Sequence, residues 1–260
     1  MKKNTLVFLL TAILFFASVV LGVTTVYRID TVYLQPVIIS QEAEKEVEEL
    51  HKRLLQAYDK QSFFSVQEKQ AKEILSEFPY FHLTSFDKSY PNRIVIKVAE
   101  YEEVYALPTA TNTAYYILGS DGTVLGLRET YINRLDGENN LLITGLEVTG
   151  ERGGTLSGDE LFLPVLTFCQ TLCDKLERIR RNVVSVEVLK MTETIVKITM
   201  REGVKIYVGN IENLTVEKAE KATEVYLGLS DEQRLTGRIA VSDEKGKLIV
   251  GYAQKDEFEF

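Results

Sequence analysis

Hydrophobic and polar positions follow several different periods along this chain, and each period predicts a different element. An uncharged apolar run fills residues 5–23, and its 19 residues approach the roughly 20 that a helix needs to cross a bilayer. Residues 40–60 repeat apolar side chains at three- and four-residue spacing, which predicts an amphipathic helix. Alternation in residues 81–84 and 94–98 predicts two strands.

The apolar run is interpreted as a transmembrane signal anchor over residues 5–25. A cleaved secretory signal has an apolar region of about 7–15 residues and then a small-x-small site, and LGVTTVY offers no clear site of that kind. A cleaved signal and a buried core helix are the alternatives. Lys2 and Lys3 precede the run without an acidic residue, so the positive-inside rule predicts that residues 1–4 are cytoplasmic and that the rest is extracytoplasmic.

Residues 26–106 predict one α+β domain with the element order strand, helix, helix, strand, strand. A strand is expected in residues 26–38, before the amphipathic helix. A second helix is predicted to begin at Ser65, where S-V-Q-E matches a capping box, and to end before Pro79. A turn at residues 90–93 joins the two alternating strands. One sheet with both helices on one face would bury the apolar stripes.

Residues 107–252 predict a second, mixed β-rich domain with helices, and residues 253–260 a short, acidic, disordered tail. The expected elements, in order, are a tight hairpin at residues 120–122, a strand at 141–148, a helix within 157–181 that starts or kinks near Pro164, three strands between 183 and 209, a helix at 215–229, and two last strands joined by a turn at 243–246.

Composition limits the function. The chain has 260 residues and a formal net charge of −8 at pH 7, enough length for one or two domains with sizeable cores. Lys2 and Lys3 lie before the apolar run, so the predicted outer part is more acidic still. Binding of nucleic acid needs a basic surface that neutralises phosphates, and we therefore expect no nucleic-acid partner.

Candidate chemistry is sparse. The sequence has no Walker, G-x-G-x-x-G, G-x-S-x-G or H-E-x-x-H motif. His51 and His82 are interpreted as surface or packed residues, and Cys169 and Cys173 as small buried apolar residues on a helix. Paired carboxylates such as residues 102–103 are expected by chance in so acidic a chain. We therefore expect no enzyme activity, no catalytic residue, no metal and no cofactor.

The last predicted strand is a better candidate for function. A strand at the edge of a sheet offers unpaired N–H and C=O groups to a segment of another chain, although it can also be merely exposed. The residues alone thus predict a membrane-anchored, β-rich binding or scaffolding protein.

Several segments, taken in order, resemble the bacterial cell-division family FtsQ, called DivIB in Gram-positive organisms. Residues 62–107 (SFFSVQEKQ to EVYAL) give the densest match and look like the second half of a POTRA domain. YYILGSDGTVL at residues 115–125 is similar to a hairpin of the family, residues 176–222 to a region beyond it, and KLIVGYA at residues 247–253 to its terminal strand.

The resemblance implies a single-pass protein of the cell membrane at the division septum, with a POTRA domain at residues 26–106 and a β-domain at 107–252. It implies a non-enzymatic divisome scaffold that binds small coiled-coil membrane proteins of the FtsB (or DivIC) and FtsL types and indirectly helps recruit and activate septal cell-wall synthases. The family's partner adds a strand at the end of the β-domain. That edge corresponds here to Leu248, Ile249, Val250, Gly251 and Tyr252, with Tyr252 in the aromatic position. A packed aromatic at the end of the strand is the alternative interpretation of Tyr252.

Two other functions fit parts of the pattern. A POTRA-containing polypeptide-docking protein of an export or envelope-assembly system shares the module, but that class is expected to carry several POTRA repeats or a long C-terminal membrane barrel. An extracytoplasmic hydrolase with an unrecognised site is the third hypothesis, and the shortage of histidines and of nucleophile motifs disfavours it.

Overall fold

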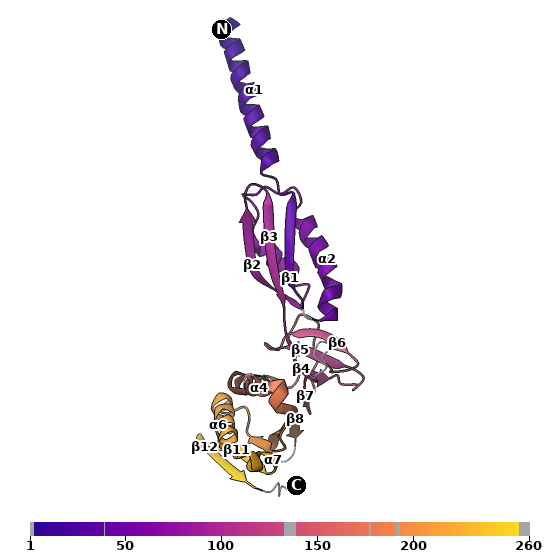
Figure 1. Ribbon diagram of the computed structural model, residues 1–260, viewed down its shortest axis with the longest axis vertical. Helices are drawn as coiled ribbons and strands as arrows, with labels where there is room; N and C mark the ends of the chain where they lie inside the picture. Colours follow the sequence, from indigo (N-terminus) through magenta and orange to yellow (C-terminus); the bar gives the residue numbers. More distant parts are fainter. Residues whose placement is uncertain (1–2, 39, 133–138, 177, 191–192, 255–260) are drawn as a thin grey trace. The chain divides into compact units, whose positions relative to one another are not determined.

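The computed structural model describes residues 3–38, 40–132, 139–176, 178–190 and 193–254 (Figure 1). It divides into two compact units, residues 1–100 and 101–260. Both are mixtures of helices and strands, so the prediction of an α+β protein with an apolar helix at its start is confirmed.

The first unit begins with a long apolar helix, α1 (Lys3–Val26). Its segment Phe8–Val26 is long and apolar enough to cross a membrane. None of that segment is buried inside the protein, so α1 is not packed as a core helix. An α-helix satisfies its own backbone hydrogen bonds, which is what the hydrocarbon interior of a bilayer demands.

A three-stranded sheet in the order β1-β3-β2 forms the rest of the first unit together with two helices. β1 (Thr31–Val37) is parallel to β3 (Arg93–Glu100), whereas β2 (Phe81–Ser89) is antiparallel to β3. α2 (Gln41–Tyr58) and α3 (Glu68–Leu75) connect β1 to β2. The predicted element order is confirmed, and the assignment of this unit as a POTRA domain stays a prediction.

The start of α2 is fixed by a side-chain cap. The Oγ of Ser40 accepts a hydrogen bond from the N–H of Ala43 at 3.1 Å, which satisfies one of the unpaired donors of the first turn. The N–H of Ser40 donates to Oε2 of Glu100 at 2.8 Å, which ties the helix start to the end of β3.

The predicted capping box at Ser65 is wrong. α3 begins at Glu68 after Gln67, and no side chain caps it. The N–H and the hydroxyl of Ser65 both donate to the carbonyl of Ser62, at 2.9 and 3.0 Å. This turn buries the side chain of Val66, which is 1% exposed, so tertiary packing overrides the local capping pattern.

Buried apolar side chains from both helices and the central strand form the core of the first unit. Those exposed by no more than 1% include Ala43, Leu50, Leu54, Tyr58, Ala71, Ile94, Ile96 and Val98. The alternating burial of β3 and the helical spacing within α2 show why one sheet face and one helix stripe meet here.

A nine-stranded mixed sheet forms the second unit, in the order β12-β11-β10-β9-β8-β7-β4-β5-β6. Its strands are β4 (Glu103–Pro108), β5 (Tyr115–Gly119), β6 (Val124–Arg128), β7 (Leu141–Thr144), β8 (Val183–Lys190), β9 (Thr194–Met200), β10 (Lys205–Gly209), β11 (Arg238–Glu244) and β12 (Lys247–Ala253). β7 pairs in parallel with β4 and β8, and β10 pairs in parallel with β11.

The helices of the second unit are α4 (Phe162–Leu176), α5 (Ile179–Asn182), α6 (Thr215–Gly228) and α7 (Asp231–Leu235). α4 and α6 pack against each other, and α6 also contacts β11 and β12. Pro164 lies in the first turn of α4, where its missing N–H has no helical partner to lose. The buried side chains of α4, α6 and the sheet form one continuous apolar core.

The sequence predicts that the second domain begins at residue 107 and ends at residue 252. β4 spans the expected domain boundary between residues 106 and 107, and it pairs with β5 and β7 in the second sheet. The tail was predicted over residues 253–260; Ala253 is the last residue of β12, and residues 255–260 lie outside the described residues.

A candidate docking edge at strand β12

β12 is the terminal strand of the nine-stranded sheet, and it contains every residue that the sequence nominated for partner binding. It runs antiparallel to β11, with Tyr252 opposite Ile239 and Lys247 opposite Glu244. The hairpin turn therefore consists of Lys245 and Gly246 alone. Both have positive φ, 51° and 77°, as a tight two-residue hairpin turn requires.

The opposite end of the sheet is covered. β6 receives a loop rich in glycine: the N–H of Val124 donates to the carbonyl of Gly154, and the N–H of Gly153 donates to the carbonyl of Val124, both at 2.8 Å. Nε of Arg152 also donates to the carbonyl of Leu125. Within the described ranges, no such backbone hydrogen bond joins the outer edge of β12 to another segment. β12 is thus the open edge.

The two faces of β12 differ. Val250 and Tyr252 pack against the core, opposite the buried Val241 and Ile239 of β11. Ile249 points to the other face and is 49% exposed. Leu248, nearer the turn, is 37% exposed. Apolar side chains at an open strand edge are the combination that β-strand addition uses, because the backbone supplies affinity and the side chains supply specificity.

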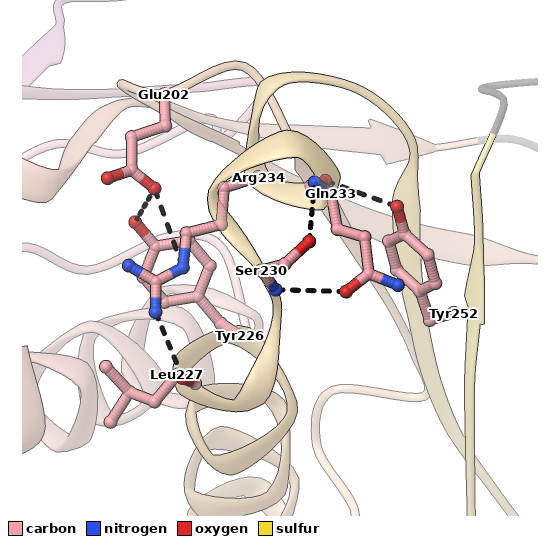
Figure 2. A network of polar contacts seen from close by, with 7 residues as sticks. All are labelled: Glu202, Tyr226, Leu227, Ser230, Gln233, Arg234 and Tyr252. Carbon is pink, nitrogen blue, oxygen red and sulfur yellow. Dashed lines mark hydrogen bonds and ion pairs between the residues drawn. The ribbon is translucent and has the colours of Figure 1, made fainter.

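Tyr252 is attached to the short helix α7. Its hydroxyl donates to the carbonyl of Gln233 at 3.2 Å (Figure 2). The same hydroxyl lies 3.4 Å from the carbonyl of Thr236. Ser230 and Gln233 form a full capping box at the start of α7. The aromatic ring of Tyr252 is therefore part of the fold of this corner, and its position is set before any partner arrives.

A second set of contacts holds α7 from its other side. The hydroxyl of Tyr226 donates to Oε2 of Glu202 at 3.0 Å, and the Arg234 guanidinium lies 5.1 Å from the Tyr226 ring centroid (Figure 2). A guanidinium nitrogen of Arg234 also donates to the carbonyl of Leu227 at 3.0 Å. Burial, followed by the hydrogen bond and the charge of Glu202, raises the pKa of Tyr226 to about 12.

Two glycines allow the chain to pass close to this corner. Gly203 has φ +126°, and an added Cβ would lie 2.3 Å from the carbonyl oxygen of Leu235. Gly237 has φ +97°, and an added Cβ would lie 2.4 Å from the carbonyl oxygen of Ala253. Side chains at either position would collide with backbone.

A buried ion pair joins α6 to β11. Lys218 of α6 is fully buried, and its Nζ donates to Oδ1 of Asp243 at 2.5 Å. The same ammonium group donates to the carbonyls of Gly209 and Asn210, at 2.9 and 2.6 Å. All three of its donors are thus used, as a buried charge requires.

The residues considered for catalysis are engaged elsewhere. Glu103 is buried and forms an ion pair with Arg128 at 2.5 Å, and Glu102 pairs with Arg180 at 2.8 Å. Nε2 of His51 lies 3.2 Å from the carbonyl of Val32. No cluster of three or more metal-ligating side chains occurs among the described residues.

The two cysteines are free thiols on α4. Cys169 is fully buried, as predicted, and burial strongly raises the pKa of its thiol. Cys173 is only partly buried, and its Sγ lies 3.6 Å from the hydroxyl of Tyr105. The interpretation of both cysteines as small buried residues is therefore confirmed for Cys169 and met only in part by Cys173, which is partly buried against the core.

Sequence reasoning missed α7 and the contacts that join it to β12. The helix has five residues and no buried side chain, so it leaves no apolar periodicity. The S-x-x-Q pattern at Ser230 is a capping signal that could have found it. Neither a comparison with protein families nor one with curated proteins gives a match for this chain.

Proposed function

We propose that this chain is a single-pass membrane scaffold of the bacterial divisome, of the FtsQ or DivIB type. It binds small coiled-coil membrane proteins of the FtsB (or DivIC) and FtsL types outside the cytoplasm, and so contributes to the recruitment and activation of septal cell-wall synthases. The observation that carries the proposal is the open edge of β12, with exposed Leu248 and Ile249, in a chain that starts with an apolar helix.

The resemblance of residues 62–107 and 247–253 to this family supports the proposal, and so does the element order of the first unit. Within the nine-stranded sheet, the occupied edge at β6 and the edge at β12, which no described segment pairs with, favour β12 as the binding position. A partner strand that pairs with β12 would place its own side chains next to Ile249.

The structure suggests better variants for the test than removal of Tyr252. Because the Tyr252 hydroxyl holds α7, Tyr252→Ala would alter folding and binding together. Ile249→Lys combined with Leu248→Lys adds charge at the edge. Leu248 shares the face of Val250 and Tyr252, but it is 37% exposed, and the core contacts of that face come from Val250 and Tyr252. We expect this double variant to lose partner affinity by at least about 2 kcal/mol, roughly 30-fold.

The measurement is recovery of two short coiled-coil membrane proteins with the full-length chain from membranes, together with photo-crosslinking from position 249. Leu163→Lys is the matched control, because Leu163 is 65% exposed on α4, a different element of the same unit. Tyr252→Phe keeps the ring that packs against the core and loses only the hydroxyl contacts with α7, so it should keep more of the binding than Tyr252→Ala. Unchanged recovery with the double lysine variant would rule out β12 as the site. Recovery of exported polypeptides instead would favour the export or assembly alternative.

A further inference from the structure

Four aromatic side chains meet directly after α1: Tyr27, Phe63, Phe64 and Tyr90. The ring centroid of Tyr27 lies 5.1 Å from that of Phe64 and 5.4 Å from that of Tyr90. The ring centroid of Phe63 lies 5.7 Å from that of Phe64 and 6.2 Å from that of Tyr90. Each ring thus contacts two others, and we call this group the aromatic cluster.

The cluster is held by backbone hydrogen bonds as well as by ring contacts. The N–H of Phe63 donates to the carbonyl of Tyr27 at 2.7 Å, and the N–H of Ile29 donates to the carbonyl of Gln61 at 2.8 Å. The N–H of Asp30 donates to an oxygen in the turn between β2 and β3, the carbonyl of Asn92, at 3.2 Å. The segments that carry the rings are therefore joined to the residues that follow α1.

This aromatic cluster is not a core. Phe64 is 69% exposed and Tyr90 is 68% exposed. The core of the same unit lies elsewhere, among α2, α3 and β3. Exposed aromatic rings that touch one another form an apolar patch, and such a patch indicates a surface that is covered by something other than water.

The length of the apolar segment in α1 sets the depth at which the aromatic cluster lies in the membrane. The segment Phe8–Val26 has 19 residues. At about 1.5 Å per residue it measures about 28 Å, close to the hydrocarbon thickness of roughly 30 Å. Tyr27 follows it directly and so lies at the level of the lipid headgroups. Phe64 and Tyr90 touch Tyr27, so they lie within one side-chain length of that level at any tilt of α1.

We propose that the aromatic cluster inserts into the headgroup layer of the same membrane that α1 crosses, and holds the first unit against the bilayer. Rings with a polar tip, such as tyrosine, are favoured at this level because one end is apolar and the other is wet. The inference rests on the proposed membrane anchoring, but it is independent of any partner at β12.

Charge around the cluster is nearly balanced. The rings belong to three segments, residues 27–30, 59–64 and 87–93. These segments carry four basic residues, Arg28, Lys60, Lys88 and Arg93, and three acidic residues, Asp30, Asp59 and Asp87. Lys88 is already engaged, because its Nζ donates to the carbonyl of Phe63 at 3.3 Å. Ring insertion, and not attraction to anionic lipid, therefore carries the contact, and we expect little dependence on salt or on anionic lipid.

The absence of tryptophan from the sequence makes a direct test possible. Phe64→Trp places a single tryptophan in the cluster of the full-length chain, which is then incorporated into phosphatidylcholine vesicles with brominated acyl chains. Val37→Trp is the matched control, because Val37 is 61% exposed at the far end of β1. Six residues of strand place it roughly 20 Å from the strand start.

We expect Phe64→Trp to lose roughly half of its emission to the bromines, since interfacial groups penetrate about 5–10 Å, and Val37→Trp to lose little. The quenching should persist in about 1 M salt, where the Debye length is about 3 Å. Tyr90→Trp is a second reporter, in case Phe64→Trp disturbs its neighbours.

Phe16→Trp, in the middle of α1, separates this inference from the anchoring on which it rests. If Phe16→Trp is quenched while Phe64→Trp and Tyr90→Trp behave like Val37→Trp, the chain is anchored and the cluster does not insert, which overturns the inference. If Phe16→Trp is not quenched, the membrane anchor itself fails. Quenching at Phe16, Phe64 and Tyr90 but not at Val37 supports the inference.

Discussion

The single side chain of Lys218 joins α6 to two strands of the second unit. This side chain is fully buried, and its ammonium group donates to a carboxylate of β11 and to the carbonyls of Gly209 and Asn210 at the end of β10. A buried ion pair adds little net stability compared with an apolar pair, but the loss of one partner is costly. Lys218 therefore fixes the position of α6 on the sheet.

Lys218→Met should destabilise the second unit by about 3–5 kcal/mol, because Asp243 and the two carbonyls would lose their buried donor. Calorimetric melting of the full-length chain in detergent measures this loss. Lys221→Met is the matched control on the same helix, and its exposed pair with Glu224 is expected to contribute less than about 1 kcal/mol. Equal melting temperatures for the two variants would contradict the prediction.

Tyr226 gives the second unit a dependence on alkaline pH. Its pKa is raised from 10.0 to about 12, so the folded state favours the neutral phenol. Stability from this group is complete below pH 10 and is lost as the pH rises toward 12. Tyr226→Phe should therefore reduce the fall in unfolding free energy between these values. Denaturant titrations at several pH values measure the slope, and an unchanged slope would exclude the assignment.

At the scale of elements, the β11–β12 hairpin depends on how closely the chain can approach itself at Gly237. Gly237→Ala should destabilise the corner by about 1–3 kcal/mol, because the residue has positive φ and its Cβ would collide with the carbonyl of Ala253. Gly228→Ala is the control, since no atom lies within 4 Å of its Cβ and it stands at the end of α6. Hydrogen exchange of β12 amides is the measurement.

Local patterns predicted most of these elements but not how they combine. The helix at residues 215–229 and the strands around it could be predicted from the sequence, because apolar side chains recur at the period of each element. The position of β7 between β4 and β8 could not be predicted, since it depends on pairing between residues far apart in sequence. Asp243 and Glu244 were expected in the turn and lie in β11, because a two-residue turn satisfies the same sequence.

The candidate site was predictable in part. The last strand could be nominated from its place in the chain, and the structure does put β12 at the end of the sheet. The sequence left two interpretations of Tyr252 open, a packed aromatic at the end of the strand and an anchor for a partner. Its attachment to α7 could not be predicted, because it consists of hydrogen bonds to backbone carbonyls. A side chain that sequence reasoning offered as an anchor for a partner is also an anchor for its own fold.

For the molecule as a whole, α1 is the element that bears on membrane anchoring, because its segment Phe8–Val26 is long and apolar enough to cross a membrane. Ile13→Lys combined with Ala17→Lys should abolish stable membrane insertion, because each charge near the helix centre costs about 2.5–3.5 kcal/mol. Resistance of the protein to alkaline carbonate extraction is the measurement. Ile13→Val with Ala17→Ser is a control that keeps the helix uncharged. Persistence of the lysine variant in the membrane pellet would contradict the prediction.

The short connection between α1 and β1 has a mechanical consequence. Only residues 27–30 separate the two elements, and hydrogen bonds from Phe63 and Ile29 fix this connection to the segment at residues 61–63. No freely rotating linker lies between helix and sheet. Rotation of α1 about its own axis would therefore turn the sheet and α2 of the same unit with it. A partner helix that binds one side of α1 would then also determine which way α2 faces.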